Sequence, residues 1–110
     1  QGGASCAGTV APVATMPAHS SADGLAFVTG EWGARYGTSA FVALFGSSFE
    51  PPTGHSVARI ALTPTPDGYA GRTSTFATGF DTPLAVATRR GALLVGDFGR
   101  GVVYRLRPRG

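Results

Sequence analysis

Short apolar runs separated by turn residues dominate the chain, and residues 83–107 show this pattern most clearly. Apolar and polar positions alternate over residues 84–88, and an apolar run follows at residues 92–95. A glycine-rich turn then leads into a third apolar stretch, residues 102–106. Runs of four to eight residues bounded by turns are typical of β-strands. Turns this short leave no room for crossover helices, so we predict an antiparallel meander.

A looser copy of the pattern precedes it, with strand-like runs at residues 24–29, 39–46 and 57–62. Each copy ends in a strand whose Arg lies among aliphatic residues. Matching Leu25 with Leu84 gives a repeat of about sixty residues, and repeated meanders build β-propellers among other arrays. The sequence therefore predicts an all-β fold of antiparallel meander sheets that amount to about two blades of a β-propeller.

The organisation expected from this repeat is an extended arm over residues 1–17, one blade over residues 18–79 and most of a last blade over residues 80–110. Residues 31–37 are predicted to be a loop held down by Trp32 and Tyr36, and residues 63–68 a turn. A propeller needs at least about four blades. We therefore expect the 110 residues to be the carboxy-terminal fragment of a propeller whose remainder lies upstream.

Composition supports this interpretation, since 17 Gly and 8 Pro suit tight turns between short strands. No apolar run approaches the length of a transmembrane helix, so we expect no membrane span. All basic residues are Arg, which excludes lysine chemistry such as a Schiff base. Six of them lie beyond residue 88, scattered over turns and alternate strand positions: Arg89, Arg90, Arg100, Arg105, Arg107 and Arg109. This scatter favours solvated edge positions over a nucleic-acid surface, and we expect no nucleic-acid partner.

Candidate chemistry is sparse. No P-loop, nucleophile elbow, zinc-protease motif or paired-cysteine motif is present. Cys6 is the single cysteine, and it is either a free thiol or the partner of a cysteine further upstream. His19 and His55 stand alone, which is more typical of surface or capping residues than of a catalytic base. The pattern alone thus predicts no catalytic residue and no metal ligand.

Five blocks of sequence carry a resemblance to a known family. They occur in order at residues 17–27, 40–47, 52–60, 91–97 and 103–106. Together they resemble the carboxy-terminal part of the soluble glucose/sorbosone dehydrogenases, a family of six-bladed β-propellers that bind pyrroloquinoline quinone, usually with calcium. The resemblance implies part of a periplasmic or extracellular oxidoreductase that acts on a sugar or aldose, with the catalytic histidine upstream of this chain.

In this family the loops at one mouth of the propeller hold the quinone. The resemblance places His19, Ser47 and Ser48 there as cofactor-binding residues. The chain departs from the family where a Trp, an Asn and an Arg are usual after residues 46–47, and where Asp81-Thr82 precedes the last blade in place of an Arg. These departures remove partners of an anionic cofactor. The alternative is a non-catalytic β-propeller module that binds a ligand through the same loops.

Three structural expectations follow. His19 should lie near residues 47–50. Asp97 should have a structural role and accept hydrogen bonds from its own turn, residues 96–101, and from Arg100, since no second acid nearby would complete a calcium site. The isolated chain should self-associate, because its last blade lacks a fourth strand and leaves an unpaired edge.

Overall fold

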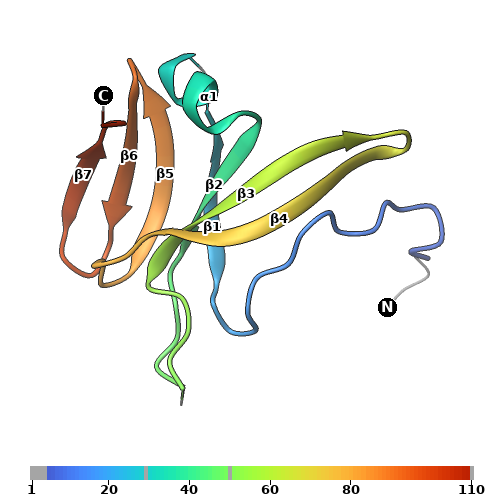
Figure 1. Ribbon diagram of the computed structural model, residues 1–110. Helices are drawn as coiled ribbons and strands as arrows, with labels where there is room; N and C mark the ends of the chain where they lie inside the picture. Colours follow the sequence, from blue (N-terminus) through green and yellow to red (C-terminus); the bar gives the residue numbers. More distant parts are fainter. Residues whose placement is uncertain (1–4, 29, 50, 110) are drawn as a thin grey trace.

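The computed structural model describes residues 5–28, 30–49 and 51–109, and these form two antiparallel sheets (Figure 1). The four-stranded sheet has the order β1-β2-β3-β4 and the three-stranded sheet the order β5-β6-β7. The elements are β1 (Ala22–Phe27), α1 (Gly30–Tyr36), β2 (Ser39–Leu44), β3 (Ser56–Thr65), β4 (Gly68–Ala77), β5 (Pro83–Arg89), β6 (Ala92–Asp97) and β7 (Val102–Leu106). Within each sheet, every strand pairs antiparallel with its neighbour in sequence, which confirms the predicted all-β meander.

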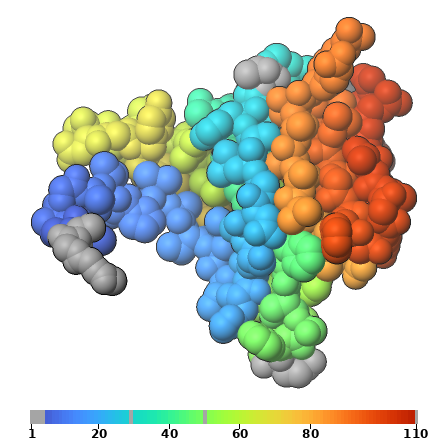
Figure 2. Space-filling model, turned by 180° about the vertical axis from the view of Figure 1, so that it is seen from behind, coloured from blue at the N-terminus to red at the C-terminus, as the bar shows by residue number. Residues whose placement is uncertain are grey.

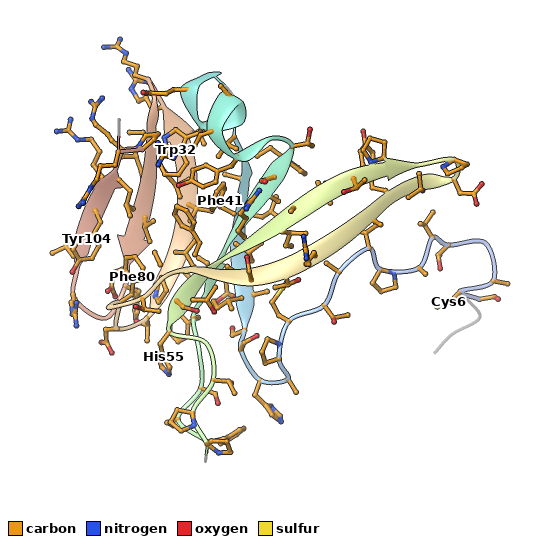
Figure 3. The ribbon with its side chains drawn as sticks, in the orientation of Figure 1. Cys6, Trp32, Phe41, His55, Phe80 and Tyr104 are labelled. Atoms are coloured by element: carbon orange, nitrogen blue, oxygen red, sulfur yellow. The ribbon has the colours of Figure 1, made fainter. Side chains whose placement is uncertain are left out.

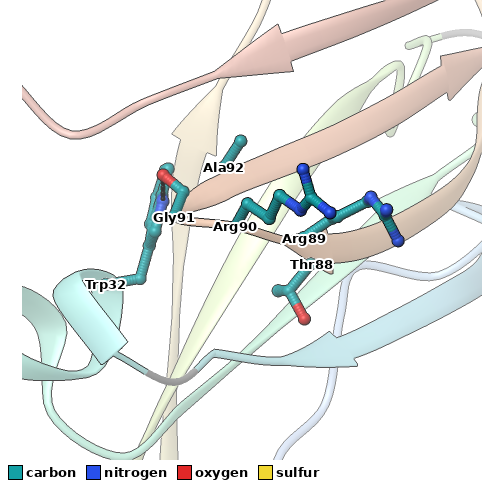
Figure 4. A pocket seen from close by; sticks show the side chains of 6 residues that line it. All are labelled: Trp32, Thr88, Arg89, Arg90, Gly91 and Ala92. Carbon is teal, nitrogen blue, oxygen red and sulfur yellow. Dashed lines mark hydrogen bonds between the residues drawn. The ribbon is translucent and has the colours of Figure 1, made fainter.

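The segment predicted as a loop between the first two strands is helical. Glu31 in the first turn of α1 and Arg35 in the last complement the helix dipole. Trp32 and Tyr36, four residues apart, lie on the same face with ring centroids 5.5 Å apart. The indole N–H of Trp32 donates to the carbonyl of Gly91, 3.0 Å away, and Figure 4 shows this ring beside the β5–β6 turn. The predicted anchoring is confirmed, while the predicted loop conformation is wrong.

The core between the two sheets is aromatic. Phe41 of β2 is fully buried and meets the rings of Trp32 and Phe76 at centroid distances of 5.7 and 4.6 Å. Leu93 and Val95 of β6 complete this cluster from the three-stranded sheet. Figure 3 shows Trp32 and Phe41 between the two sheets. Although β4 looks polar in sequence, the end of this strand, at Phe76 and Ala77, packs against the core.

The arm covers the opposite face of the four-stranded sheet. Its described part, residues 5–17, contains neither helix nor strand. Ala14 and Met16 pack on a second apolar cluster that includes Val42 and Ile60. The N–H of Gly71 donates to the carbonyl of Val13, 3.0 Å away. Figure 2 shows the arm in blue and β1, in cyan, directly beside β5, in orange.

The internal repeat is visible in the strand register. Pairing is irregular between Ala22 and Gly24 in the first sheet, and between Pro83 and Ala85 in the second. The same one-residue bulge thus begins both sheets, which aligns Gly24 with Ala85 and Leu25 with Val86. Matching Leu25 with Leu84 is therefore wrong by two residues, because Leu84 lies in the bulge.

Chain direction decides which connections lie together. Because the strands alternate in direction, the β2–β3, β4–β5 and β6–β7 connections lie at one end of the sheets, next to the segment that enters β1. We call this end the loop end; its described residues are 17–21, 45–49, 51–55, 79–82 and 98–101. In Figure 1 it lies at the bottom, while α1 and the β5–β6 turn lie at the top.

Candidate functional site

Backbone contacts hold the loop end together. The N–H groups of Phe45 and Gly46 donate to the carbonyls of Ser21 and Ser20 over 2.9 and 2.8 Å. Gly54 has a φ of +79°, and a Cβ there would lie 2.6 Å from the Cα of Gly46. Only glycine fits so close to another backbone in a left-handed conformation. These contacts fix the β2–β3 hairpin against the segment that leads into β1.

His19 lies at this end, as predicted. Its exposed ring meets the ring of Phe49 edge-on, with centroids 5.2 Å apart, which confirms the prediction for the described part of that neighbourhood, residues 47–49. Ser47 is half-buried and Ser48 exposed on the same hairpin. Glu50, the last residue of that predicted neighbourhood, lies outside the described residues. The three predicted cofactor-binding residues thus share one end of the molecule, and their role there stays a prediction.

His55 ties the hairpin to the segment that joins the two sheets. Its Nδ1 lies 2.7 Å from the Asp81 carbonyl oxygen and its Nε2 lies 3.0 Å from the Ser47 carbonyl oxygen. Both partners accept hydrogen bonds only, so the two bonds form together when both ring nitrogens carry a proton, which is the imidazolium form. The bond to Asp81, followed by the bond to Ser47, raises the pKa of His55 above its ordinary 6.5 despite partial burial.

These two hydrogen bonds of His55, which we call the His55 clamp, could not be predicted from the sequence pattern. The acceptors lie 8 and 26 residues from His55 along the chain, and both are backbone carbonyls. Figure 3 shows His55 where the hairpin leaves the sheet. A residue predicted to be an isolated surface or capping histidine is therefore a structural cross-link between two loop segments.

Asp97 has the predicted structural role, but its donors are different. The side chain is 1 % exposed and accepts the N–H groups of Asp81 and Thr82 over 2.8 and 2.9 Å. Burial alone would raise the pKa of Asp97; these two bonds, with a smaller contribution from Arg100, lower it below its ordinary 3.8. These two donors thus come from the segment that crosses between the sheets, which the sequence did not predict. Of the predicted turn, only Arg100 contributes, and its effect is smaller.

Two further charged groups lie at the loop end. The Arg100 guanidinium donates to the carbonyl of Gly79 over 2.7 Å and to the hydroxyl of Tyr104 over 3.2 Å. Asp81 is exposed on the same crossing segment. Within the described parts of the chain, no group of three or more His, Cys, Asp or Glu side chains could hold a metal ion.

Exposed aromatic rings complete the loop end. Phe49 is 64 % exposed and Phe98 is 69 % exposed. The ring of Phe98 lies 6.2 Å from that of Phe45 between centroids. A single exposed ring is ordinary, whereas several apolar rings at one end of a molecule are typical of surfaces that bind a ligand or a partner. The sequence did not single out these rings, because their neighbourhood depends on three separate connections.

The other candidates lie elsewhere. A hollow of about 80 Å³ at the opposite end is lined by Trp32 and residues 88–92, including Arg89 and Arg90. Figure 4 shows the side chains that line it. Cys6 is exposed and free at the far end of the arm (Figure 3). Neither lies near His19, so the loop end is the place where the predicted residues meet.

Comparison of the chain with protein-family models, curated proteins and solved structures found no match. Within the described residues, no helix has the length and apolar character needed to cross a membrane.

Proposed function

We propose that the chain supplies two neighbouring blades of a β-propeller, and part of its ligand mouth, to a quinone-dependent sugar dehydrogenase of the glucose/sorbosone type. The supporting observation is that His19 lies against Phe49 beside Ser47 and Ser48 at the loop end. Four connections meet there, and binding residues concentrate on such loops above a rigid sheet scaffold. The remaining blades, the catalytic histidine and the sugar-binding residues belong to the rest of a periplasmic or extracellular enzyme.

The described residues fit the cofactors unequally. An anionic quinone would find His19 and the Arg100 guanidinium at the loop end, both exposed. Calcium prefers about six to eight oxygen ligands, and the described residues offer no cluster of acids for it. Calcium would therefore have to be held by residues outside those described here, and we assign no metal ligand within them.

Quinone uptake by the full-length protein tests this proposal. Pyrroloquinoline quinone is titrated by equilibrium dialysis, with and without calcium, into the natural protein and into H19A. We expect calcium-supported binding that weakens at least about tenfold in H19A, the loss of roughly one good polar or stacking contact. The matched control is D67N in the β3–β4 hairpin at the opposite end, which should bind as the natural protein does. Equal affinity of H19A and D67N would remove His19 from the site.

The second candidate is a non-catalytic β-propeller module that binds a ligand through the same loops. The specific observation that favours it is the pair of exposed rings, Phe49 and Phe98, where an anionic cofactor would be held better by cations. The same dialysis separates the two functions. No quinone uptake at any calcium concentration would reject the dehydrogenase and leave the binding module.

A further inference from the structure

The three-stranded sheet has an apolar outer face, which points away from the four-stranded sheet. Alternate residues of its strands form this face: Ala85, Ala87, Leu94, Gly96, Val103 and Arg105. Val103 is 70 % exposed. A hollow of about 200 Å³ in this region is lined largely by apolar residues that include Leu84 and Val103. An exposed apolar face of this kind marks a surface for association.

The internal repeat shows what covers such a face. In the aligned register, this outer face is equivalent to the inner face of the four-stranded sheet. The equivalence holds for each row, meaning each set of paired residues across the first three strands. The row Ala85–Gly96–Val103 corresponds to Gly24–Ala43–Val57, and the row Ala87–Leu94–Arg105 corresponds to Ala26–Phe41–Arg59. Residue size and polarity agree closely along both rows. The inner face of the four-stranded sheet is the one that the three-stranded sheet covers within this chain.

Small residues make that internal contact possible. A Cβ added at Gly24 would lie 2.8 Å from the Cα of Ala85 and 2.8 Å from the carbonyl oxygen of Leu84. The first strands of the two sheets thus touch backbone to backbone. Ala85 and Ala87, at the equivalent positions of β5, leave similar room for the first strand of another sheet.

The chain also carries the complementary face. Val86, Leu93 and Val95 of the three-stranded sheet pack into the core, and their equivalents in the repeat are Leu25, Ala40 and Val42 on the outer face of the four-stranded sheet. Ala14 and Met16 of the arm cover the β2–β3 part of that face. Its β1 part stays accessible: Phe27 is 58 % exposed, and Leu25 is exposed as well.

We propose that the outer face of the three-stranded sheet docks onto the accessible β1 part of the outer face of the four-stranded sheet of a second copy of this chain. The contact repeats between molecules the packing that already joins the two sheets within one molecule. It is heterologous, since each copy uses a different face toward each neighbour, so successive copies form a closed ring or an open chain. The proposal does not depend on quinone binding. It concerns the 110-residue chain by itself, because neighbouring blades would cover both faces in the propeller proposed above.

Arg105 does not prevent this contact. Its equivalent, Arg59, lies half-buried on the covered inner face. There the Arg59 guanidinium donates to the Tyr36 carbonyl over 2.7 Å and lies 5.2 Å from the centroid of the Tyr36 ring. The internal contact thus accommodates an arginine at this position. The new contact lacks counterparts of Tyr36, Trp32 and Phe76, so Arg105 would have no such partner and the contact should be weaker than the internal one.

Mass measurements on the full 110-residue chain test the proposal. Sedimentation equilibrium from about 1 to about 200 µM should show a mass that rises with concentration. V103D and F27D each place a carboxylate on one of the two faces, at exposed positions that the monomer fold tolerates. Each should raise the dissociation constant at least about tenfold. F49D, at an exposed position on neither face, is the matched control and should associate as the natural chain does.

A mixture of the two variants identifies the geometry. V103D keeps its four-stranded face and F27D keeps its three-stranded face, so a one-to-one mixture should form dimers and nothing larger. If F27D alone still dimerises while V103D does not, the contact is symmetric and the proposal is wrong. A natural chain that stays monomeric, or variants that associate like F49D, would reject it too. Unfolding curves of each variant verify that the monomer remains folded.

Discussion

Removing the His55 clamp should destabilise the fold in a pH-dependent manner. H55N is the informative change: His55 has a φ of +58°, and Asn is among the residues that tolerate this left-handed conformation. The shorter side chain cannot span the two carbonyls that His55 joins. The variant therefore tests the hydrogen bonds without adding backbone strain.

The magnitude follows from two hydrogen bonds with a charged donor. Each contributes about 1.5–3 kcal/mol when well buried, and partial exposure reduces this, so we expect H55N to lose about 2 kcal/mol of unfolding free energy at about pH 5.5. A neutral ring has one N–H, so it keeps one bond and turns a lone pair toward the other carbonyl. The loss should therefore fall to about 1 kcal/mol at about pH 8.5.

The sign is set by the raised pKa of His55. A raised pKa in the folded state means that the stabilisation is fully present below the unfolded value of 6.5 and is lost as the pH rises through the folded value. The nearby Asp81 carboxylate acts in the same direction. The natural protein should therefore lose stability, relative to H55N, as the solution becomes alkaline.

Urea unfolding at the two pH values and at low chain concentration measures the effect. H19N is the matched control, because His19 is exposed and its ring meets Phe49 instead of two carbonyls. We expect H19N to follow the natural protein at both pH values. A difference between the natural protein and H55N that is constant, or that grows with pH, would refute the assignment of an imidazolium clamp.

Three other substitutions, D97N, G24A and W32F, test the contacts between the sheets, and the first two have matched controls. D97N removes the charge that accepts two backbone N–H groups and should lower the unfolding free energy by about 2 kcal/mol in a urea titration, equally with and without calcium. Its control is T82V, which should be nearly neutral in the same titration because the Thr82 hydroxyl has no partner among the described residues. G24A places a methyl group against the backbone of β5 and should lower the unfolding free energy by about 2 kcal/mol or more. Its control is G96A, where the nearest atom to a new Cβ lies 3.8 Å away, so thermal unfolding should show no measurable loss of stability. W32F deletes an indole N–H that is bonded to the β5–β6 turn and should lose about 1–3 kcal/mol, with hydrogen exchange increasing in that turn.

Alternation and glycine turns were enough to predict the sheets, because register and burial impose a two-residue period on each strand. These patterns were not enough where a residue that favours a turn lies in a segment that tertiary strand pairing keeps extended. Residues 63–68 were predicted as a turn on account of their prolines, yet β3 continues to Thr65 and Pro64 pairs with Tyr69. The ladder between β2 and β3 ends at Ala61. A missing N–H at Pro64 therefore costs no bond on that side.

The loop end shows a different limit of the sequence. The family resemblance placed His19 near residues 47–50, because both segments border strands of the same blade in that family. The partners of His55 and Asp97 could not be predicted in this way. Both side chains bind backbone groups of residues 81–82, at the junction of the two sheets. Their geometry exists only after the sheets have packed.

Two arginines at equivalent positions of the repeat have different environments. Arg59 and Arg105 occupy the same place in the third strand of each copy, among aliphatic residues. Arg59 is half-buried, because α1 brings the Tyr36 carbonyl and ring to its guanidinium. The second repeat, β5–β7, has a tight turn in place of α1, so Arg105 is left exposed. The same residue in the same register is thus an internal contact in one sheet and a surface group in the other, and the difference is made by the connection between the first two strands.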